Sequence, residues 1–177
     1  MSELPCVLLS TPDGDLIVEV DVRAAPQTAA HFLEFAERGY LSNSAIYRIV
    51  TPANVERSPA ISVIQFGWLV RSIDDRPLPP VPHEPTGLTG LRHRDGSISL
   101  ARAGAGTGGC AFFFCIGDQP ALDEGGGRAD DGLGFAAFGR LVGGRAALTT
   151  LFEKAEENEM VVNPVRIGGR VLRRTDF

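Results

Sequence analysis

The chain has 177 residues, of which 44% are hydrophobic and 22% are charged, a composition typical of a globular protein. Its 17 basic and 22 acidic side chains give a formal net charge of −5, which argues against a protein whose main task is to bind a phosphate backbone. No apolar run approaches a membrane span, and the first residues lack the basic start and apolar run of an export signal. We therefore expect one domain over residues 1–177, monomeric and cytoplasmic, with no nucleic-acid or membrane partner.

The first part of the chain predicts a hairpin, a helix and two further strands. Val7–Ser10 and Leu16–Val20 flank a turn that contains Pro-Asp-Gly, which predicts a β-hairpin. After Pro26, apolar residues recur at positions 29, 32, 33 and 36, the spacing of a helix face packed on a core. Ile46–Val50 and Ile61–Phe66 predict strands, joined by a polar loop that contains two prolines.

The rest of the chain predicts more strands and a second helix. Arg71–Thr89 contains five prolines and predicts a loop across the surface. Because the strands do not alternate with helices, a doubly wound parallel sheet is disfavoured, and a mainly β fold is expected, a closed antiparallel barrel with helices over its ends. The remaining predicted elements are strands at Gly96–Arg102, Ala111–Ile116, Phe135–Val142 and Val165–Arg173, a glycine- and aspartate-rich insertion at 123–134, and a helix at Arg145–Ala155.

One motif points to a nucleotide site, but its context is wrong. Gly104–Gly109 matches G-x-G-x-x-G, yet a strand-forming run follows it where a dinucleotide site needs a helix, so we expect a surface loop. The three histidines and three cysteines show no close metal-ligand spacing, and we expect neither a metal nor a cofactor. Cys110 and Cys115 lie in or beside an apolar run and are expected to be reduced packing residues.

A different group of residues suggests a pocket. Arg48 lies in the middle of one apolar strand, and Gln65 lies in another. Alternation along these strands also allows Arg48 to face solvent and Phe113 to lie in the core, so the residues alone indicate only a β-rich domain with a polar pocket. The candidate walls of that pocket are Val63, Phe113, Leu122 and Phe135.

Several segments, taken together and in this order, carry a family resemblance. The most specific is Gly96–Ala103, with the sequence GSISLARA, followed by Phe112-Phe113. The others are Gly14–Val20, Ala25–Thr28, Phe32-Leu33, Ile46–Val50, Val63–Gln65, Leu122-Asp123 and Phe138-Gly139. Over nearly its whole length the chain resembles the cyclophilin family of peptidyl-prolyl isomerases, and the insertion before Phe135 is similar to the bacterial branch. The resemblance implies a closed eight-stranded antiparallel β-barrel capped by two α-helices, with a substrate groove on its outer surface.

The resemblance also implies an activity, the cis–trans isomerisation of Xaa–Pro bonds in peptides and folding proteins, with no cofactor. Arg48 would donate a hydrogen bond to the proline nitrogen of the twisted amide, and Gln65 would hold Arg48 or a substrate carbonyl. The implied substrate-binding residues are Val63, Ala101, Arg102 through its backbone, Ala103, Ala111, Phe113, Ala121, Leu122 and Phe135.

Three positions depart from the family pattern. Ala111 stands where the family has glutamine, Ala121 where it has a pocket aromatic, and Ser62 where it has phenylalanine. The loop Thr51–Ala60 is also a few residues longer than usual. These changes favour an alternative, a module that binds proline-containing peptides with weak or no isomerase activity. A third hypothesis is a domain that serves a larger assembly through the proline-rich loop Arg71–Thr89.

Overall fold

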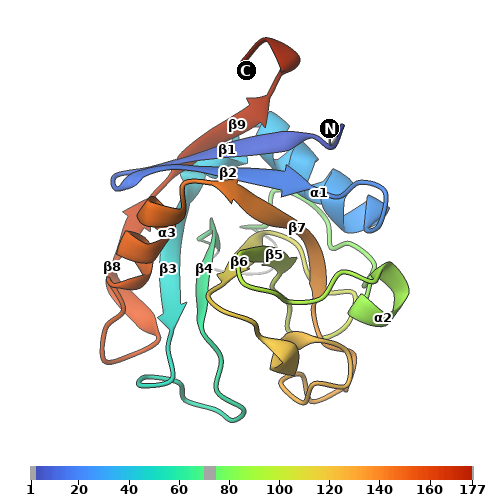
Figure 1. The fold of residues 1–177 in the computed structure, drawn as a ribbon, viewed down its shortest axis with the longest axis vertical. Helices are drawn as coiled ribbons and strands as arrows, with labels where there is room; N and C mark the ends of the chain where they lie inside the picture. Colours follow the sequence, from blue (N-terminus) through green and yellow to red (C-terminus); the bar gives the residue numbers. More distant parts are fainter. Residues whose placement is uncertain (1–2, 70–74, 177) are drawn as a thin grey trace.

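The computed structural model describes residues 3–69 and 75–176, and over these ranges it has a mainly β fold with three α-helices (Figure 1). The strands are β1 Cys6–Thr11, β2 Gly14–Val20, β3 Ser44–Val50, β4 Val63–Trp68, β5 Ser97–Leu100, β6 Ala111–Cys115, β7 Ala136–Gly143, β8 Met160–Arg166 and β9 Gly168–Leu172. The helices are α1 Pro26–Glu37, α2 Thr86–Thr89 and α3 Arg145–Phe152, with short 3-10 turns at Tyr40–Asn43, Pro120–Leu122 and Arg174–Asp176. None of the helices in the described ranges is long and apolar enough to cross a membrane.

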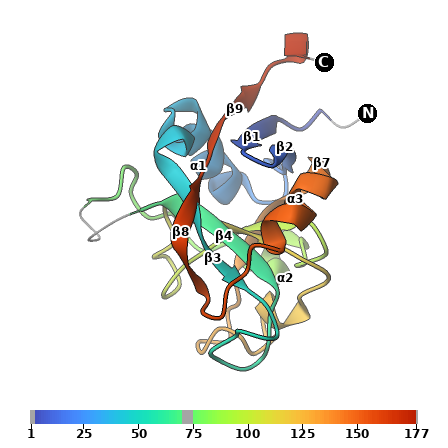
Figure 2. The same cartoon turned by 90° about the vertical axis from the view of Figure 1, so that its left-hand side faces the viewer.

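The described strands form one antiparallel sheet in the order β8-β3-β4-β6-β5-β7-β2-β1-β9. Figures 1 and 2 show from two sides that this sheet is strongly curled. The sheet is an open half-barrel of nine strands, so the prediction of a closed eight-stranded barrel with two helices was wrong. The predicted last strand, Val165–Arg173, divides at Ile167: β8 pairs with β3 at one edge of the sheet and β9 pairs with β1 at the other. Most of β8 was not predicted from the sequence, because its side chains are largely exposed and show no apolar alternation.

The additional helix, α2, lies in the segment that was predicted to be a loop, Arg71–Thr89. It is a single turn of four residues, too short to give a periodic apolar pattern. Residues 71–74 of that predicted loop lie outside the described residues. The predicted hairpin, the two predicted helices, and the strands at β3 to β7 are confirmed, with ends that differ by a few residues.

The two longer helices cover the two openings of the curled sheet. Phe32 and Phe35 of α1 pack on Phe112, with ring centroids 4.8 and 5.3 Å apart, and α3 packs against β2 and β4. The first turn of α1 has no side-chain cap of its own, because its N-cap residue is Ala25. The buried Glu84 carboxylate, far away in sequence, accepts the Thr28 N–H at 2.7 Å and so satisfies a free helix donor.

The middle of the sheet is buried on both faces. Along β4 and β6 successive side chains alternate, so that Ile64, Phe66, Phe112 and Phe114 enter the main core inside the curl. The intervening side chains point to the outer face. There a second buried group, here called the outer cluster, consists of Val50, Ile61, Val63, Phe113, Cys115 and Leu122. The continuous apolar run Ala111–Ile116 is therefore explained by one strand that serves two apolar layers.

The structure also tests the predictions made for the glycine-rich loop and for the cysteines. Gly104–Gly109 forms a loop that leads into β6, not into a helix, as expected. Cys110 is buried in the main core and Cys115 in the outer cluster, which confirms that both are packing residues. In the described part of the chain, no group of three or more histidine, cysteine or acidic side chains is placed to hold a metal ion.

Candidate active site

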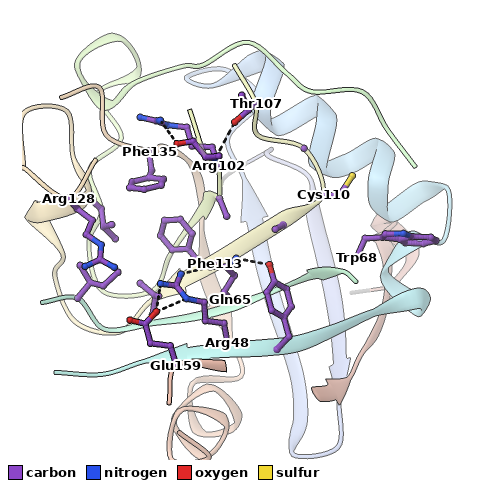
Figure 3. Close-up of a pocket in the computed structure, with 18 of the residues that line it drawn as sticks. Arg48, Gln65, Trp68, Arg102, Thr107, Cys110, Phe113, Arg128, Phe135 and Glu159 are labelled. Atoms are coloured by element: carbon purple, nitrogen blue, oxygen red, sulfur yellow. Dashed lines mark hydrogen bonds and ion pairs between the residues drawn. The ribbon is translucent and has the colours of Figure 1, made fainter. Parts of the chain in front are cut away.

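A pocket of about 450 Å³ lies over the outer cluster, on the outer face of β3, β4 and β6 (Figure 3). Ten of the eleven site residues predicted from the sequence line it: Arg48, Val63, Gln65, Ala101, Arg102, Ala103, Ala111, Phe113, Leu122 and Phe135. The eleventh, Ala121, does not line the pocket; its partly buried side chain packs against the outer cluster. The structure thus brings together residues from positions as far apart as 48 and 135.

A bulge in β3 directs Arg48 to this face. Ile46 pairs with Phe66 and Arg48 pairs with Gln65, so that Tyr47 is an extra residue between two consecutive pairs. Regular alternation would give Arg48 the same side as Ile46, whose side chain is in the main core. With the bulge, Tyr47 and Arg48 both line the pocket, and Ile49 returns to the core.

The Arg48 guanidinium is held by two partners. Its Nη1 donates to Gln65 Oε1 at 2.8 Å, and its Nε and Nη2 both donate to Glu159 Oε1, at 2.9 and 2.5 Å. Gln65 in turn donates from Nε2 to the Tyr47 hydroxyl oxygen at 2.6 Å. Figure 3 shows Glu159, Arg48 and Gln65 together along one wall of the pocket, below Phe113.

Arg48 nevertheless keeps donors for a ligand. A guanidinium carries five N–H groups, and three of them are engaged by Gln65 and Glu159. One N–H on each Nη atom has no partner among residues 3–69 and 75–176. The Arg48 side chain is 25% exposed, whereas that of Glu159 is only 6% exposed, so the cation and not the anion is the accessible member of the pair.

The surroundings of Glu159 keep this carboxyl group ionised. Burial alone would raise the pKa of Glu159, but the Glu56 backbone N–H and the Arg48 guanidinium outweigh that effect, and the pKa lies below its usual value. Glu159 is therefore ionised at neutral pH, and Arg48 is always a cation. Burial also raises the pKa of Tyr47, so its hydroxyl stays protonated and can donate into the site.

Phe113 is supported from behind by a buried polar row. The His93 ring stacks on it at 6.0 Å between centroids, with Nδ1 2.8 Å from Asp123 Oδ1 and Nε2 2.8 Å from Ser99 Oγ. A carboxylate can only accept, so the neutral ring carries its proton on Nδ1 and accepts from the Ser99 hydroxyl. Burial lowers the pKa of His93, which keeps the ring in this neutral form. The hydrogen bonds at both ends of the ring fix the plane on which Phe113 rests.

A second arginine closes the other side of the pocket. Arg102 forms a two-pronged ion pair with Asp131, with both N–O distances 2.9 Å, and its Nε donates to Gly134 O, also at 2.9 Å. Its guanidinium carbon lies 5.2 Å from the centre of the Phe135 ring, and that ring packs edge-on against Phe113 at 5.7 Å. The hydrogen bonds from Arg102 hold the pKa of Asp131 down, at about 2. Phe135 is in this way fixed by a side chain that was expected to act through its backbone.

A protein-family model matches most of this chain. The protein-family model for "Cyclophilin type peptidyl-prolyl cis-trans isomerase/CLD" matches residues 6–170. The chain belongs to the cyclophilin family. The family assignment from sequence motifs is thus confirmed.

Proteins named peptidyl-prolyl cis-trans isomerase, or isomerase-like, in several organisms resemble this chain at modest identity. A peptidyl-prolyl cis-trans isomerase of Helicobacter pylori strain J99 is 29% identical over 115 residues, which are 65% of this chain and 65% of that protein. The aligned part thus spans just under two thirds of that relative's length. Isomerase CYP18-2 of Arabidopsis thaliana is 30% identical over 121 residues, 67% of this chain and 68% of its own. Isomerase-like protein 3 of Gibberella zeae is 28% identical over 175 residues, 91% and 92% of the two chains.

Solved cyclophilin structures share the fold. A cyclophilin-type isomerase of Cryptosporidium parvum superposes with a TM-score of 0.73 at 20% identity, over 97% of this chain and 99% of that one. A second structure of that protein, determined in the presence of the dipeptide Ala-Pro, gives a TM-score of 0.70 at 21% identity, over 96% and 99%. The half-barrel and its helices are therefore those of a cyclophilin.

Several pocket residues were missed by the sequence analysis. Glu159 lies in a polar segment with no periodic pattern, and Tyr47 reaches the pocket only because of the β3 bulge. Ile61 could have been found, because it begins the predicted strand Ile61–Phe66; it supplies apolar wall next to the departure at Ser62. The other lining residues not predicted are Glu56, Arg57, Trp68, Arg76, Thr107, Gly109, Cys110 and Arg128.

Proposed function

We propose that this cyclophilin catalyses the cis–trans isomerisation of Xaa–Pro bonds in peptides and in folding proteins. The observation that carries the proposal is the position of Arg48, a permanent cation with two uncommitted N–H groups at the edge of the pocket that contains Phe113. Relatives named as isomerases, and a related structure determined with Ala-Pro, support this choice of reaction and of ligand.

The reaction needs differential binding and no bond chemistry. The barrier to rotation about an amide is about 18–20 kcal/mol, because resonance must be broken, and the free reaction takes tens to hundreds of seconds. In the twisted state the proline nitrogen regains its lone pair and can accept a hydrogen bond. A donor that meets only this state lowers the barrier, and a thousandfold gain needs about 4 kcal/mol.

The chain supplies that donor and the surfaces that orient the peptide. An N–H of Arg48 would meet the pyramidal nitrogen, while the ring of proline would lie against Phe113, Val63 and Leu122. The peptide on the amino side of proline would run along Ala101–Ala103, where β5 has ended. In the described part of the chain, the backbone N–H and C=O of Arg102 make no hydrogen bond, so both can serve a peptide there.

The wider description of the protein rests on its sequence. One domain over residues 1–177, a monomeric state, a cytoplasmic location and the lack of a cofactor stay predictions. The reaction proposed for Arg48 itself uses no cofactor or metal, since it changes only which amide geometry is bound best.

A second function is favoured by one observation, the loss of a polar partner at Ala111. If that change removes the grip on the substrate carbonyl, the pocket would bind proline-containing peptides with weak turnover or none. Whether Ala111, Ala121 and Ser62 weaken peptide binding or turnover is therefore a question for the experiment below.

The test is the exchange between cis and trans forms of an Xaa–Pro peptide, measured by NMR with and without catalytic amounts of the protein, together with a peptide titration. Accelerated exchange is the expected result. Binding without acceleration would select the binding module, and unchanged exchange without binding would overturn both functions for the peptides used.

A further inference from the structure

Glu159 is a buried carboxylate with no counterpart among the site residues that the sequence suggested. It directly precedes β8, and both of its oxygens are occupied. Oε1 accepts two hydrogen bonds from Arg48, and Oε2 accepts the backbone N–H of Glu56 at 2.8 Å. With only 6% of its side chain exposed, Glu159 can act on a substrate mainly through Arg48.

The segment around Glu159 is itself held firmly. Its backbone C=O accepts the Ile49 N–H at 2.9 Å, which ties it to β3 next to Arg48. The buried Asn54 side chain donates to both Ile49 O and Glu156 O at 3.0 Å. Asn54 and Glu56 both belong to the Thr51–Ala60 loop, the loop that is longer than the family pattern. The extra loop therefore braces the carboxylate that contacts Arg48.

Two partners on different atoms of the guanidinium fix its orientation. Gln65 binds Nη1, whereas Glu159 binds Nε and Nη2, so rotation about the last side-chain bonds would break at least one charge-assisted hydrogen bond. A free arginine side chain loses rotamer entropy when it is fixed in one orientation. Holding it in place before the peptide arrives removes that cost from the catalytic step.

We propose that Glu159 is a positioning residue for catalysis, which orders the Arg48 guanidinium so that its two remaining N–H groups face the proline pocket. This inference rests on the proposed isomerase function. Glu159 also partly neutralises Arg48, and loss of the carboxylate alone would strengthen the field of the cation. The ordering effect and the charge effect therefore act on turnover in opposite directions, and the ordering effect is the larger of the two.

The experiment compares Glu159→Gln with Glu157→Gln. The glutamine keeps the shape of Glu159, but if its oxygen faces Arg48, its NH₂ must face the Glu56 N–H, another donor. Glu157 is exposed in the same segment, so its substitution removes the same charge without a contact to Arg48. For each protein we would measure kcat and KM by peptide exchange, the melting temperature, and the ¹⁵Nε order parameter of Arg48 in the peptide-free state.

The expected result is specific to Glu159→Gln. Its kcat falls about tenfold with KM within twofold of wild type, and the order parameter of Arg48 Nε falls, while Glu157→Gln matches wild type in every measurement. An unchanged or raised kcat in Glu159→Gln overturns the proposal. If wild type shows no turnover, the isomerase function fails by itself, and an unchanged Arg48 order parameter in Glu159→Gln then overturns positioning as well.

Discussion

Arg48 and Arg102 lie on opposite sides of one pocket, and each is paired with a carboxylate, but they differ in how many donors are left. All five N–H groups of Arg102 have acceptors, on Asp131, on the Gly134 carbonyl and, more weakly, on the Ala103 carbonyl. Arg48 uses three of its five. The Arg102 side chain is 3% exposed and that of Arg48 is 25% exposed.

The difference separates a structural arginine from a chemically available one. Arg102 donates most of its hydrogen bonds to the 131–134 turn and lies over Phe135, so its side chain has a structural role in the pocket wall. Arg48 is ordered by its hydrogen bonds to Gln65 and Glu159 and keeps two N–H donors for a ligand. An ion pair at the site is therefore compatible with catalysis when the partner covers only one part of the guanidinium.

The largest effect is expected for Arg48→Ala. Loss of one donor aimed at the transition state typically costs about 100- to 1,000-fold, or roughly 2.7–4 kcal/mol, and we expect this loss in kcat/KM from peptide exchange. The single variant also leaves Glu159 buried and unpaired, so we expect about 2 kcal/mol less stability in urea unfolding. The double variant Arg48→Ala/Glu159→Gln should recover most of the stability and none of the activity. Recovery of activity in the double variant would mean that the unpaired Glu159 carboxylate, and not the missing Arg48 donor, caused the loss of activity in the single variant.

A smaller effect, and mainly one on stability, is expected for Arg102→Ala. Removal of a buried side chain that satisfies Gly134 and covers Phe135 should lower the free energy of unfolding by about 2–3 kcal/mol. Peptide KM should rise because Phe135 loses its support, while kcat changes little. The matched control is Asp131→Asn, which keeps the Arg102 packing and should be milder. A large fall in kcat for Arg102→Ala, with KM unchanged, would contradict the structural role.

The smallest effect is a pH dependence that comes from His93, beneath Phe113. Burial lowers the pKa of His93 below its ordinary value of 6.5, so the folded protein binds this proton less readily than the unfolded chain. Stability should therefore fall as the pH is lowered from about 6.5 to the folded pKa, by at most about 1.36 kcal/mol per pH unit. Urea unfolding between pH 5 and 8 measures this slope, and His93→Gln should remove it. An equal slope in both proteins would assign the pH dependence to other groups.

The sequence predicted most of the strands and helices, because their apolar patterns are local. It identified ten of the residues that line the pocket through motifs whose order matches the cyclophilin family. It could not predict the bulge at Tyr47, because a one-residue change of pairing leaves no mark in apolar alternation, yet that bulge brings Arg48 to the outer face. By alternation alone, Arg48 would share a side with Ile46.

Polar contacts between residues far apart in the chain also could not be predicted from the sequence. Glu159 is 111 positions from Arg48, and Glu84 caps α1 from 56 positions away, with no pattern around either residue that marks its partner. The division of the last predicted strand at Ile167 was missed for a related reason, since the exposed residues of β8 carry no periodic signal. These features depend on tertiary pairing and not on local propensity.

The most direct test of the difference between the two arginines is to replace each by lysine and measure exchange at saturating Xaa–Pro peptide. Lysine keeps the charge but lacks the planar set of donors. We expect at least a tenfold lower kcat for Arg48→Lys and a kcat within threefold of wild type for Arg102→Lys, counted per folded molecule. The opposite order, or equal losses in both variants, would contradict this expectation.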